Sequence, residues 1–225
     1  MRTKALLGLA ALAVGLSTSV AQNVYSLNVV GYVNVSLQQN KLHFLSLPLA
    51  PVDGNFNITN TIILDDTQNL ASMYRWIGNG WNSDVAYFGG WSSPSDVFIT
   101  NGVAFFIASV TNSTLTFVGQ VNQGAMNYSF GPGLSAVANQ VPVSTNFPGA
   151  TVGNLLDGII LWDTALQNWN TDWGNGGGSW ANSGSPTGPG GPDNVNGPLI
   201  NPAEGFFYSN FGSTPVAFTQ NFTVQ

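Results

Sequence analysis

The chain has 225 residues, of which 44% are hydrophobic, 12% aromatic and 6% charged, with a formal net charge of −6. Four cations against ten carboxylates leave no basic patch for nucleic acid or for an anionic membrane, so neither partner is expected. Cysteine is absent, which excludes disulfides and thiol chemistry, and a single histidine argues against a transition-metal cluster. Stability is therefore expected to come from β pairing and from burial of aromatic rings.

Residues 1–21 have the pattern of a secretory signal peptide. Arg2 and Lys4 form a basic start, residues 5–16 form an apolar run, and the small residues 19–21 suit a cleavage site. The apolar run is too short to span a bilayer. The protein is therefore expected to be exported by a bacterial Sec route, and to be secreted or held at the cell surface without a membrane span after cleavage. An uncleaved anchor is the alternative.

The segment 22–40 is predicted to hold a β-strand. Apolar residues alternate with Ser and Asn between Tyr25 and Ser36, as in a strand with one buried face. Gly31 either lies within one long strand or divides the run into two. We expect this extra N-terminal strand to have no counterpart later in the chain and to complete or join two repeated units.

The first repeated unit is predicted to span 41–122. Strands are expected over 44–49, 59–64 and 71–76, with a single helical turn near 65–70. Three tryptophans follow, set among glycines that indicate tight turns: Trp76, Trp81 and Trp91.

Residues 99–121 and 200–222 align without a gap at a constant offset of 101 residues. Each copy has an apolar run with large residues on both faces, a polar turn, and a return strand that alternates apolar and polar residues. Because both copies keep the same phase, we interpret the chain as a tandem duplication whose matched aromatic residues lie in the core. The matched pairs are Phe105 with Phe206 and Phe106 with Phe207.

A linker is predicted at 123–136, where glycine and proline are frequent, followed by the second unit over 137–225. The stretch 174–198 is so rich in Gly, Pro, Ser and Asn that a flexible surface loop is predicted there. The tryptophans of this unit match those of the first, with one in addition: Trp162, Trp169 and Trp180, and the extra Trp173.

Catalytic residues are not indicated by any motif. His43 lies in a strand-like stretch and is interpreted as a partly exposed structural residue, and no nucleophile elbow is present. Glu204 is the only glutamate, and no spacing singles out a second carboxylate that would complete a glycosidase pair. The protein is therefore predicted not to be an enzyme.

Two short Asp/Asn stretches begin at Asp53 and Asp193 and alternate oxygen ligands of the kind that Ca²⁺ takes. Neither has the late acidic ligand of an EF-hand loop, and Asp and Asn also favour turns for backbone reasons. We interpret both as turns, with weak calcium sites as the alternative and no other metal or cofactor expected.

The tryptophans are the main candidates for a binding site. Exposed indole rings beside Asn and Asp would stack on pyranose rings while their polar neighbours bind hydroxyl groups. Trp173 is the best candidate for an exposed ring, because it has no match in the first unit and lies in a Gly-rich stretch. Core packing is the interpretation that we favour for the repeated tryptophans, and protein contacts are a third. The candidate sugar-stacking residues are Trp173, Trp169, Trp180, Trp81 and Trp91.

Residues 24–33, 117–124 and 201–207 resemble segments of small secreted two-repeat β proteins of Verrucomicrobia and related bacteria, and the resemblance covers essentially all of the chain after the leader. The segment 201–207 is also similar to a Phe-Phe signature of Gly/Trp-rich β modules in secreted proteins of Bacteroidetes. Its counterpart at 101–104 lacks the proline and the acid of that signature, so the first copy follows it less closely. The resemblance implies an exported β-repeat protein and carries no catalytic residue to this chain.

Together these observations predict an all-β fold of two similar tandem units, each sandwich-like or barrel-like, with an extra N-terminal strand. The expected role is that of a secreted, non-enzymatic surface or extracellular-matrix protein that acts through contacts with itself or with other extracellular proteins. The alternative is a carbohydrate-binding module that binds polysaccharide through exposed tryptophans.

Overall fold

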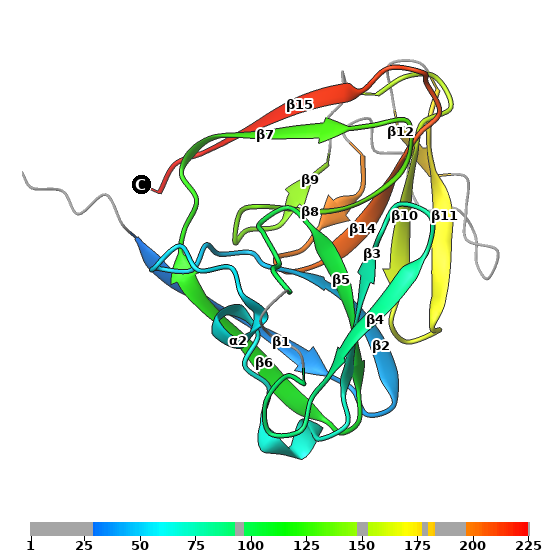
Figure 1. Cartoon of the computed structure of the whole chain (residues 1–225). Helices are drawn as coiled ribbons and strands as arrows, with labels where there is room; N and C mark the ends of the chain where they lie inside the picture. Colours follow the sequence, from blue (N-terminus) through cyan, green and yellow to red (C-terminus); the bar gives the residue numbers. More distant parts are fainter. Residues whose placement is uncertain (1–28, 93–96, 148–152, 177–179, 183–196, 225) are drawn as a thin grey trace, which may run out of the picture.

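The computed structural model describes residues 29–92, 97–147, 153–176, 180–182 and 197–224 (Figure 1). Within them the predicted all-β fold is confirmed: the helical parts are the single-turn helix α2 (Ile58–Thr61) and the 3-10 turn η1 (Asp66–Gln68). No helix in this described part of the chain is long and apolar enough to cross a membrane. The predicted leader, 1–21, lies outside the described residues.

The first half of the chain forms a four-stranded antiparallel sheet with the order β2-β5-β3-β4 and a two-stranded ribbon, β1-β6. β5 is buried on both faces, as its apolar run predicts, whereas β6 alternates buried and exposed residues. Leu115 and Phe117 of β6 therefore face the sheet, where they join Phe105 and Ile107 in one core. The bounds are β1 (Val30–Leu37), β2 (Lys41–Ser46), β3 (Ser72–Trp76), β4 (Trp81–Ala86), β5 (Ala104–Ser109) and β6 (Ser113–Gln120).

The second half forms a five-stranded sheet with the order β12-β11-β10-β14-β8, a ribbon β15-β7, and a short pair β13-β9. Tyr128 and Phe130 of β7 point from the ribbon into a second core that includes Phe206 and Tyr208 of β14. The bounds are β7 (Gly124–Phe130), β8 (Gly133–Ala138), β9 (Thr145–Asn146), β10 (Gly158–Asp163), β11 (Asn168–Asn175), β12 (Trp180–Asn182), β13 (Leu199–Ile200), β14 (Gly205–Asn210) and β15 (Val216–Phe222).

The order of strand pairing is similar in the two halves. β5 lies between β2 and β3, and β14 lies between β8 and β10. β1 pairs with β6 as β7 pairs with β15, so β7 holds the position in the second half that the N-terminal strand holds in the first. The expectation that the N-terminal strand has no counterpart is therefore wrong, because the stretch predicted as a linker supplies that strand in the second half. Such a parallel is what a duplication would give, and the duplication itself stays a prediction.

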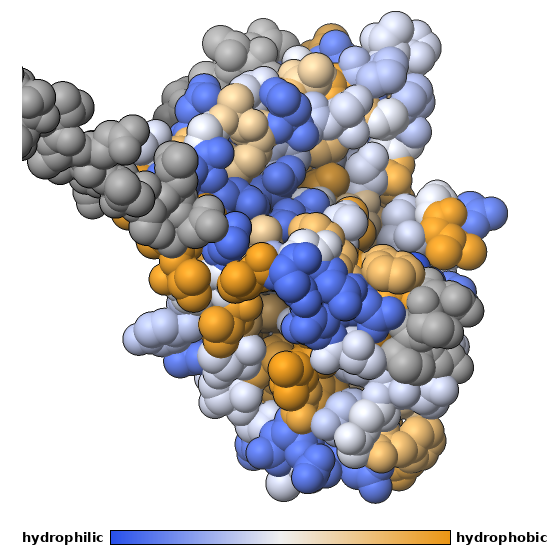
Figure 2. Space-filling view, turned by 60° about the vertical axis from the view of Figure 1, so that its left-hand side comes forward, coloured by the Kyte–Doolittle hydropathy of each residue, from blue (hydrophilic) through white to orange (hydrophobic). Residues whose placement is uncertain are grey.

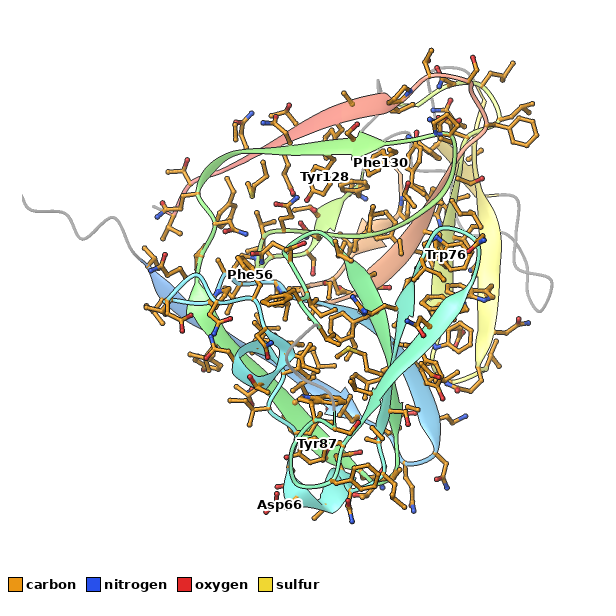
Figure 3. All side chains as sticks on the ribbon, in the orientation of Figure 1. Phe56, Asp66, Trp76, Tyr87, Tyr128 and Phe130 are labelled. Carbon is orange, nitrogen blue, oxygen red and sulfur yellow. The ribbon has the colours of Figure 1, made fainter. Side chains whose placement is uncertain are left out.

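The two sheets pack against each other through the faces that the ribbons leave uncovered. β5 places Phe105 in the first core and Phe106 on the opposite face, and β14 does the same with Phe206 and Phe207. The layers therefore run ribbon, sheet, sheet, ribbon, with the two ribbons on the outside (Figure 1). Figure 3 places Trp76 at the level where the sheets meet, Tyr87 in the first core and Tyr128 in the second.

Two equivalent β-bridges join the sheets, one formed by an edge strand of each half. Leu45 of β2 forms an isolated bridge with Glu204, and Val137 of β8 forms the corresponding bridge with Val103. The sheets are thus joined by backbone contacts at the residues just before the central strands β5 and β14, as well as by side chains. This double attachment fixes the relative placement of the side chains that extend between them.

Several sequence predictions differ from the structure in detail. The segment predicted as a linker, 123–136, contains β7 and the start of β8, because Met126, Tyr128 and Phe130 alternate with polar residues and are buried. The strand predicted over 59–64 is instead α2, which begins after Asn57, whose side chain caps the backbone N–H of Thr59 at 3.0 Å.

The flexible loop predicted over 174–198 also needs correction at its ends. Its first residues close β11, and Trp180–Asn182 form β12, which pairs with β11. Trp180 is fully buried there. Residues 177–179 and 183–196 of the predicted loop lie outside the described residues.

Candidate functional site

An open groove lies between the two sheets and has an almost entirely aromatic lining. Its volume is about 400 Å³. β2, β3, β4 and β5 of the first half supply four of the lining residues, and β10 and β11 of the second half supply two. We call it the aromatic groove, and its residues are Leu42, Tyr74, Trp81, Phe106, Trp162 and Trp169.

The indoles reach this groove from two matched hairpins. Trp76 and Trp81 are direct partners across β3 and β4, and Trp162 and Trp169 are direct partners across β10 and β11. Partners in an antiparallel pair project from the same face of the sheet. The ring centroids of each pair are accordingly close, at 5.3 Å and 4.8 Å, and both pairs face the opposite sheet.

A β-bulge in each hairpin turns the tryptophan toward the groove. Between the pairs Ile159/Trp173 and Leu161/Asn170, β11 has one residue more than β10. In a regular strand Trp169 and Trp173 would share a face, because they are four positions apart. The extra residue moves them to opposite faces, so Trp169 lines the groove while Trp173 enters the second core.

The hairpin of the first half has the same irregularity. Between the pairs Met73/Val85 and Arg75/Asn82, β4 has one residue more than β3. Trp81 therefore lines the groove, and Val85, four positions further on, lies in the first core. In both walls of the groove, a β-bulge therefore places the tryptophan on the groove side of its strand.

Phe106 and Phe207 pack against the tryptophan rings of the two hairpins on the side away from the opening of the groove. Phe106 lies 5.0 Å from Trp162 and 4.8 Å from Trp81 between ring centroids. Phe207 makes the corresponding contacts with Trp76, at 5.1 Å, and with Trp169, at 5.2 Å. Such tilted and edge-to-face pairs add about 0.5–1.5 kcal/mol each beyond the area that they bury.

Hydrogen bonds fix the indoles to the opposite sheet. The Trp162 Nε1–H donates to the backbone oxygen of Leu42 at 2.8 Å, and the Trp76 Nε1–H donates to that of Leu134 at 3.3 Å. The side chain of Gln167 accepts from the Leu42 backbone N–H at 2.8 Å. The groove is therefore held in shape before any ligand enters, which lowers the entropy lost on binding.

The rings differ in how much of each faces solvent. Trp81 is 36% exposed, whereas Trp162, Trp169 and Tyr74 are half-buried. Phe106 is only 5% exposed and forms the floor. A ligand in the groove would therefore meet aromatic faces and edges at the walls and a closed apolar base.

Two of the five predicted sugar-stacking residues, Trp81 and Trp169, line this groove. The prediction of an exposed Trp173 is wrong, because its ring is 9% exposed and packs in the second core. Trp91 and Trp180 are buried in the first and second cores, which is the core interpretation that the sequence favoured for repeated tryptophans.

Sequence reasoning missed four of the lining residues. The sequence identifies Trp162 as a match for Trp76 and Phe106 as a repeated core residue, but neither as a site residue, and Leu42 and Tyr74 carry no signal beyond alternation. These side chains meet only because one sheet packs on the other. The alternation of apolar and polar residues within a strand does not specify which sheet packs against it.

The candidate calcium residues behave as turn residues where the structure describes them. The Asp53 carboxylate accepts from the Asn55 backbone N–H at 2.9 Å and from the Asn60 side-chain amide at 2.9 Å. Asp193 lies outside the described residues. Within those residues no group of three or more His, Asp or Glu side chains is placed to hold a metal ion.

A second groove, of about 290 Å³, adjoins the first, and Trp162 lines both. His43 and Glu204 are its titratable residues. The prediction of a partly exposed His43 is wrong: its side chain is 4% exposed because β2 is covered on both faces. Its Nε2 lies 2.9 Å from the Gln38 backbone N–H, which donates to it, and 3.3 Å from the Gln38 backbone oxygen.

Burial shifts the pKa of these two residues in opposite senses. It lowers the pKa of His43 below the ordinary value of 6.5, against a smaller raising effect of the Gln38 backbone. It raises the pKa of Glu204 above 4.5, against the lowering effect of hydrogen bonds from Asn201. The neutral form of His43 therefore stabilises the fold above pH 6.5, and this stability is lost as the pH falls through the lowered pKa. The protonated form of Glu204 stabilises the fold at low pH, and this stability is lost as the pH rises through the raised pKa.

We expect the melting temperature of Glu204→Gln to fall when the pH is lowered from 7.5 to 5.5, because protonation of His43 is then the main change left in this range. Each pKa unit of difference between the folded and unfolded states corresponds to about 1.4 kcal/mol. Adding His43→Gln, which keeps an acceptor for the Gln38 N–H, should flatten the dependence. Equal slopes in scanning calorimetry of the two variants would contradict this assignment.

Comparison with protein-family models, with curated proteins and with solved structures finds no match to this chain. The resemblance to secreted two-repeat proteins therefore stays a prediction, and the function is argued from the grooves.

Proposed function

We propose that this protein is a secreted, non-enzymatic binding protein whose aromatic groove binds carbohydrate. The observation that carries the proposal is the open groove lined by Trp81, Trp162, Trp169 and Tyr74. A pyranose ring has an apolar face of C–H groups, which packs on an indole face, while its hydroxyl groups stay at the edge. The volume, about 400 Å³, is in the range of small-ligand sites.

The fixed geometry of the rings supports a binding role over a purely structural one. Three of the tryptophans of the chain are buried in the cores, yet Trp81 is left partly open at a groove wall. A protein that needed this indole only for packing would gain more by covering it, because each buried aromatic side chain contributes about 1.5–3 kcal/mol. Exposure alone does not mark a site, since Tyr32 and Phe211 are more exposed, but Trp81 is open at the wall of a groove where a ligand would cover it.

The absence of enzymatic activity is part of the proposal. His43 is buried with Nε2 engaged to the backbone, and in the described part of the chain Glu204 is the only carboxylate that lines either groove. Hydrolysis of a glycosidic bond normally uses a pair of carboxylates. Release of reducing ends from a bound polysaccharide would contradict this part of the proposal.

The test is affinity electrophoresis of the purified protein in gels that contain one polysaccharide each: xyloglucan, glucomannan, arabinoxylan, β-glucan or polygalacturonate. At least one neutral polysaccharide is expected to retard the protein and to change its tryptophan fluorescence. If none retards it and the fluorescence is unchanged in all of them, the carbohydrate function is overturned. Export rests on the sequence pattern of residues 1–21 and is tested separately by fractionating the native host culture.

Self-association is a second candidate function, supported by the outer face of the β1-β6 ribbon. Tyr32 and Val118 are direct cross-strand partners there and are 73% and 66% exposed, with Val30 beside them. Figure 2 looks onto the side of the molecule where β1 begins and shows apolar surface between polar patches. Within the described residues β1 pairs only with β6, and it holds neither a charged residue nor a proline that would hinder pairing of its other edge.

Light scattering over a range of protein concentrations tests this second candidate. A mass that rises with concentration and returns to that of the monomer in Tyr32→Lys would support association through the ribbon. A monomer at all concentrations would remove it and would leave the carbohydrate proposal untouched.

A further inference from the structure

The groove that adjoins the aromatic groove differs from it in chemistry. We call it the polar groove, because six of its lining residues carry hydrogen-bonding side chains. They come from β1, from the β1–β2 turn, from β2, from the residue after β10 and from the turn before β14. These residues are Ser36, Gln38, His43, Thr164, Asn201 and Glu204.

Trp162 connects the two grooves. It lines both grooves, and its Nε1–H donates to the Leu42 backbone oxygen at 2.8 Å. Phe44, whose ring centroid lies 4.6 Å from that of Phe106 at the floor of the aromatic groove, lines the polar groove. A chain-like ligand could therefore pass from one groove to the other across a single fixed ring.

Glu204 is held so that one carboxylate oxygen remains available. The Asn201 backbone N–H and side-chain amide both donate to Oε2, at 2.9 Å and 3.0 Å. Within the described residues no hydrogen bond engages Oε1. The turn that positions Glu204 is closed by its own backbone N–H, which donates to the Asn201 oxygen at 3.2 Å. Oε1 is thus a fixed acceptor at the wall of the polar groove.

The charge of the lining indicates which ligand fits. Among the residues that the structure describes, no lysine or arginine lines either groove, and the Glu204 carboxylate is the only charged side chain that does. The chain as a whole carries a formal charge of −6. A ligand with carboxylate or sulfate groups would be repelled, whereas hydroxyl groups would donate to Oε1.

We propose that the two grooves form one continuous cleft for an uncharged glycan chain, in which sugar rings stack in the aromatic groove and the hydroxyl groups of the adjoining units bind Glu204 in the polar groove. This inference rests on the proposed carbohydrate function and adds to it the extent of the site and the class of the glycan. Amino acid side chains other than the tryptophans are thereby assigned to binding.

The test is isothermal titration of the full-length protein with di-, tetra- and hexasaccharides of the cello-, manno- and xylo- series, and with oligogalacturonates of the same lengths. For the neutral series that binds, affinity is expected to rise at least about tenfold from the disaccharide to the hexasaccharide, because only the longer chain reaches both grooves. Oligogalacturonates are expected not to bind.

Glu204→Ala is expected to lower the hexasaccharide affinity by about tenfold and to leave the disaccharide affinity unchanged. Asp66→Asn is the matched control, because this carboxylate is exposed in η1, at the far end of the first half from the grooves (Figure 3). Melting temperatures establish that both variants are folded. Glu204→Gln provides a second variant of the same size, which removes the charge and replaces the acceptor at the Oε1 position with an amide donor.

The outcomes separate the two proposals. Equal affinity for all chain lengths, with no effect of Glu204→Ala, would overturn the continuous cleft and leave the aromatic groove as the site. Preferential binding of oligogalacturonates would overturn the assignment of an uncharged glycan. If no oligosaccharide or polysaccharide binds, the carbohydrate function fails, and the cleft fails with it.

Discussion

Alanine in place of Trp81 is expected to lower the affinity for a neutral polysaccharide by about thirtyfold. Truncation of a central aromatic anchor costs roughly 2 kcal/mol in binding, which corresponds to that factor. The Trp81 ring is 36% exposed and forms one wall of the aromatic groove. The loss is measured by titration calorimetry or from retardation in affinity gels.

The matched control for this variant is Tyr32→Ala. Tyr32 is an exposed aromatic residue on the outer face of β1, on the side of the first half that faces away from the second sheet. Its replacement should leave the affinity within a factor of about two. Trp169→Ala should behave like Trp81→Ala, because Trp169 forms the wall that the second sheet contributes. Equal losses in Tyr32→Ala and Trp81→Ala would show that general aromatic surface, and not the groove, binds the polysaccharide.

The largest effect on stability is expected for Phe106→Ala, which should lower the free energy of unfolding by about 3–5 kcal/mol. The ring is 5% exposed and contacts Phe44, Trp81 and Trp162 at centroid distances of 4.6, 4.8 and 5.0 Å. Its removal loses the transfer free energy of the ring and leaves a cavity between two sheets that cannot collapse independently. Urea denaturation measures the change.

Phe211→Ala is the control for this second prediction. Its side chain is 72% exposed in the turn after β14, so the substitution should change the unfolding free energy by less than about 0.5 kcal/mol. A small effect of Phe106→Ala, similar to that of Phe211→Ala, would mean that the two sheets do not depend on the aromatic contact between them.

The parts of the fold that alternation specifies could be predicted from the sequence. The all-β class, the two-sided burial of the strand with Phe105 and Phe106, and the inward phase of Leu115 and Phe117 are confirmed. These follow from residues close together in the chain, because the period of a strand assigns each side chain to a face.

The direction of the tryptophans could not be predicted in the same way. Trp169 and Trp173 have the spacing of residues on one face, and only the bulge in β11 separates them. The position of a bulge depends on the pairing register with β10, which a single strand does not encode. The unmatched position of Trp173 in a Gly-rich stretch predicts an exposed ring, whereas the residue lies opposite Ile159 in the second core.

The aromatic groove could not be predicted from the sequence, for a different reason. Tyr74 and Trp162 come from strands far apart in the chain, and they meet only because the uncovered faces of two sheets pack together. The burial of His43 could not be predicted for the same reason, because it comes from contacts on both faces of β2 and not from its neighbours in sequence. Long-range packing is where sequence patterns lose their information.

The most direct test of the central claim uses the indole N–H resonances of the seven tryptophans in a protein labelled with nitrogen-15. On titration with the best neutral hexasaccharide, the signals of Trp81, Trp162 and Trp169 should shift, and those of the core residues Trp91, Trp173 and Trp180 should stay in place. Shifts confined to the core tryptophans, or saturating binding without a shift at the three groove residues, would contradict the aromatic groove as the binding site.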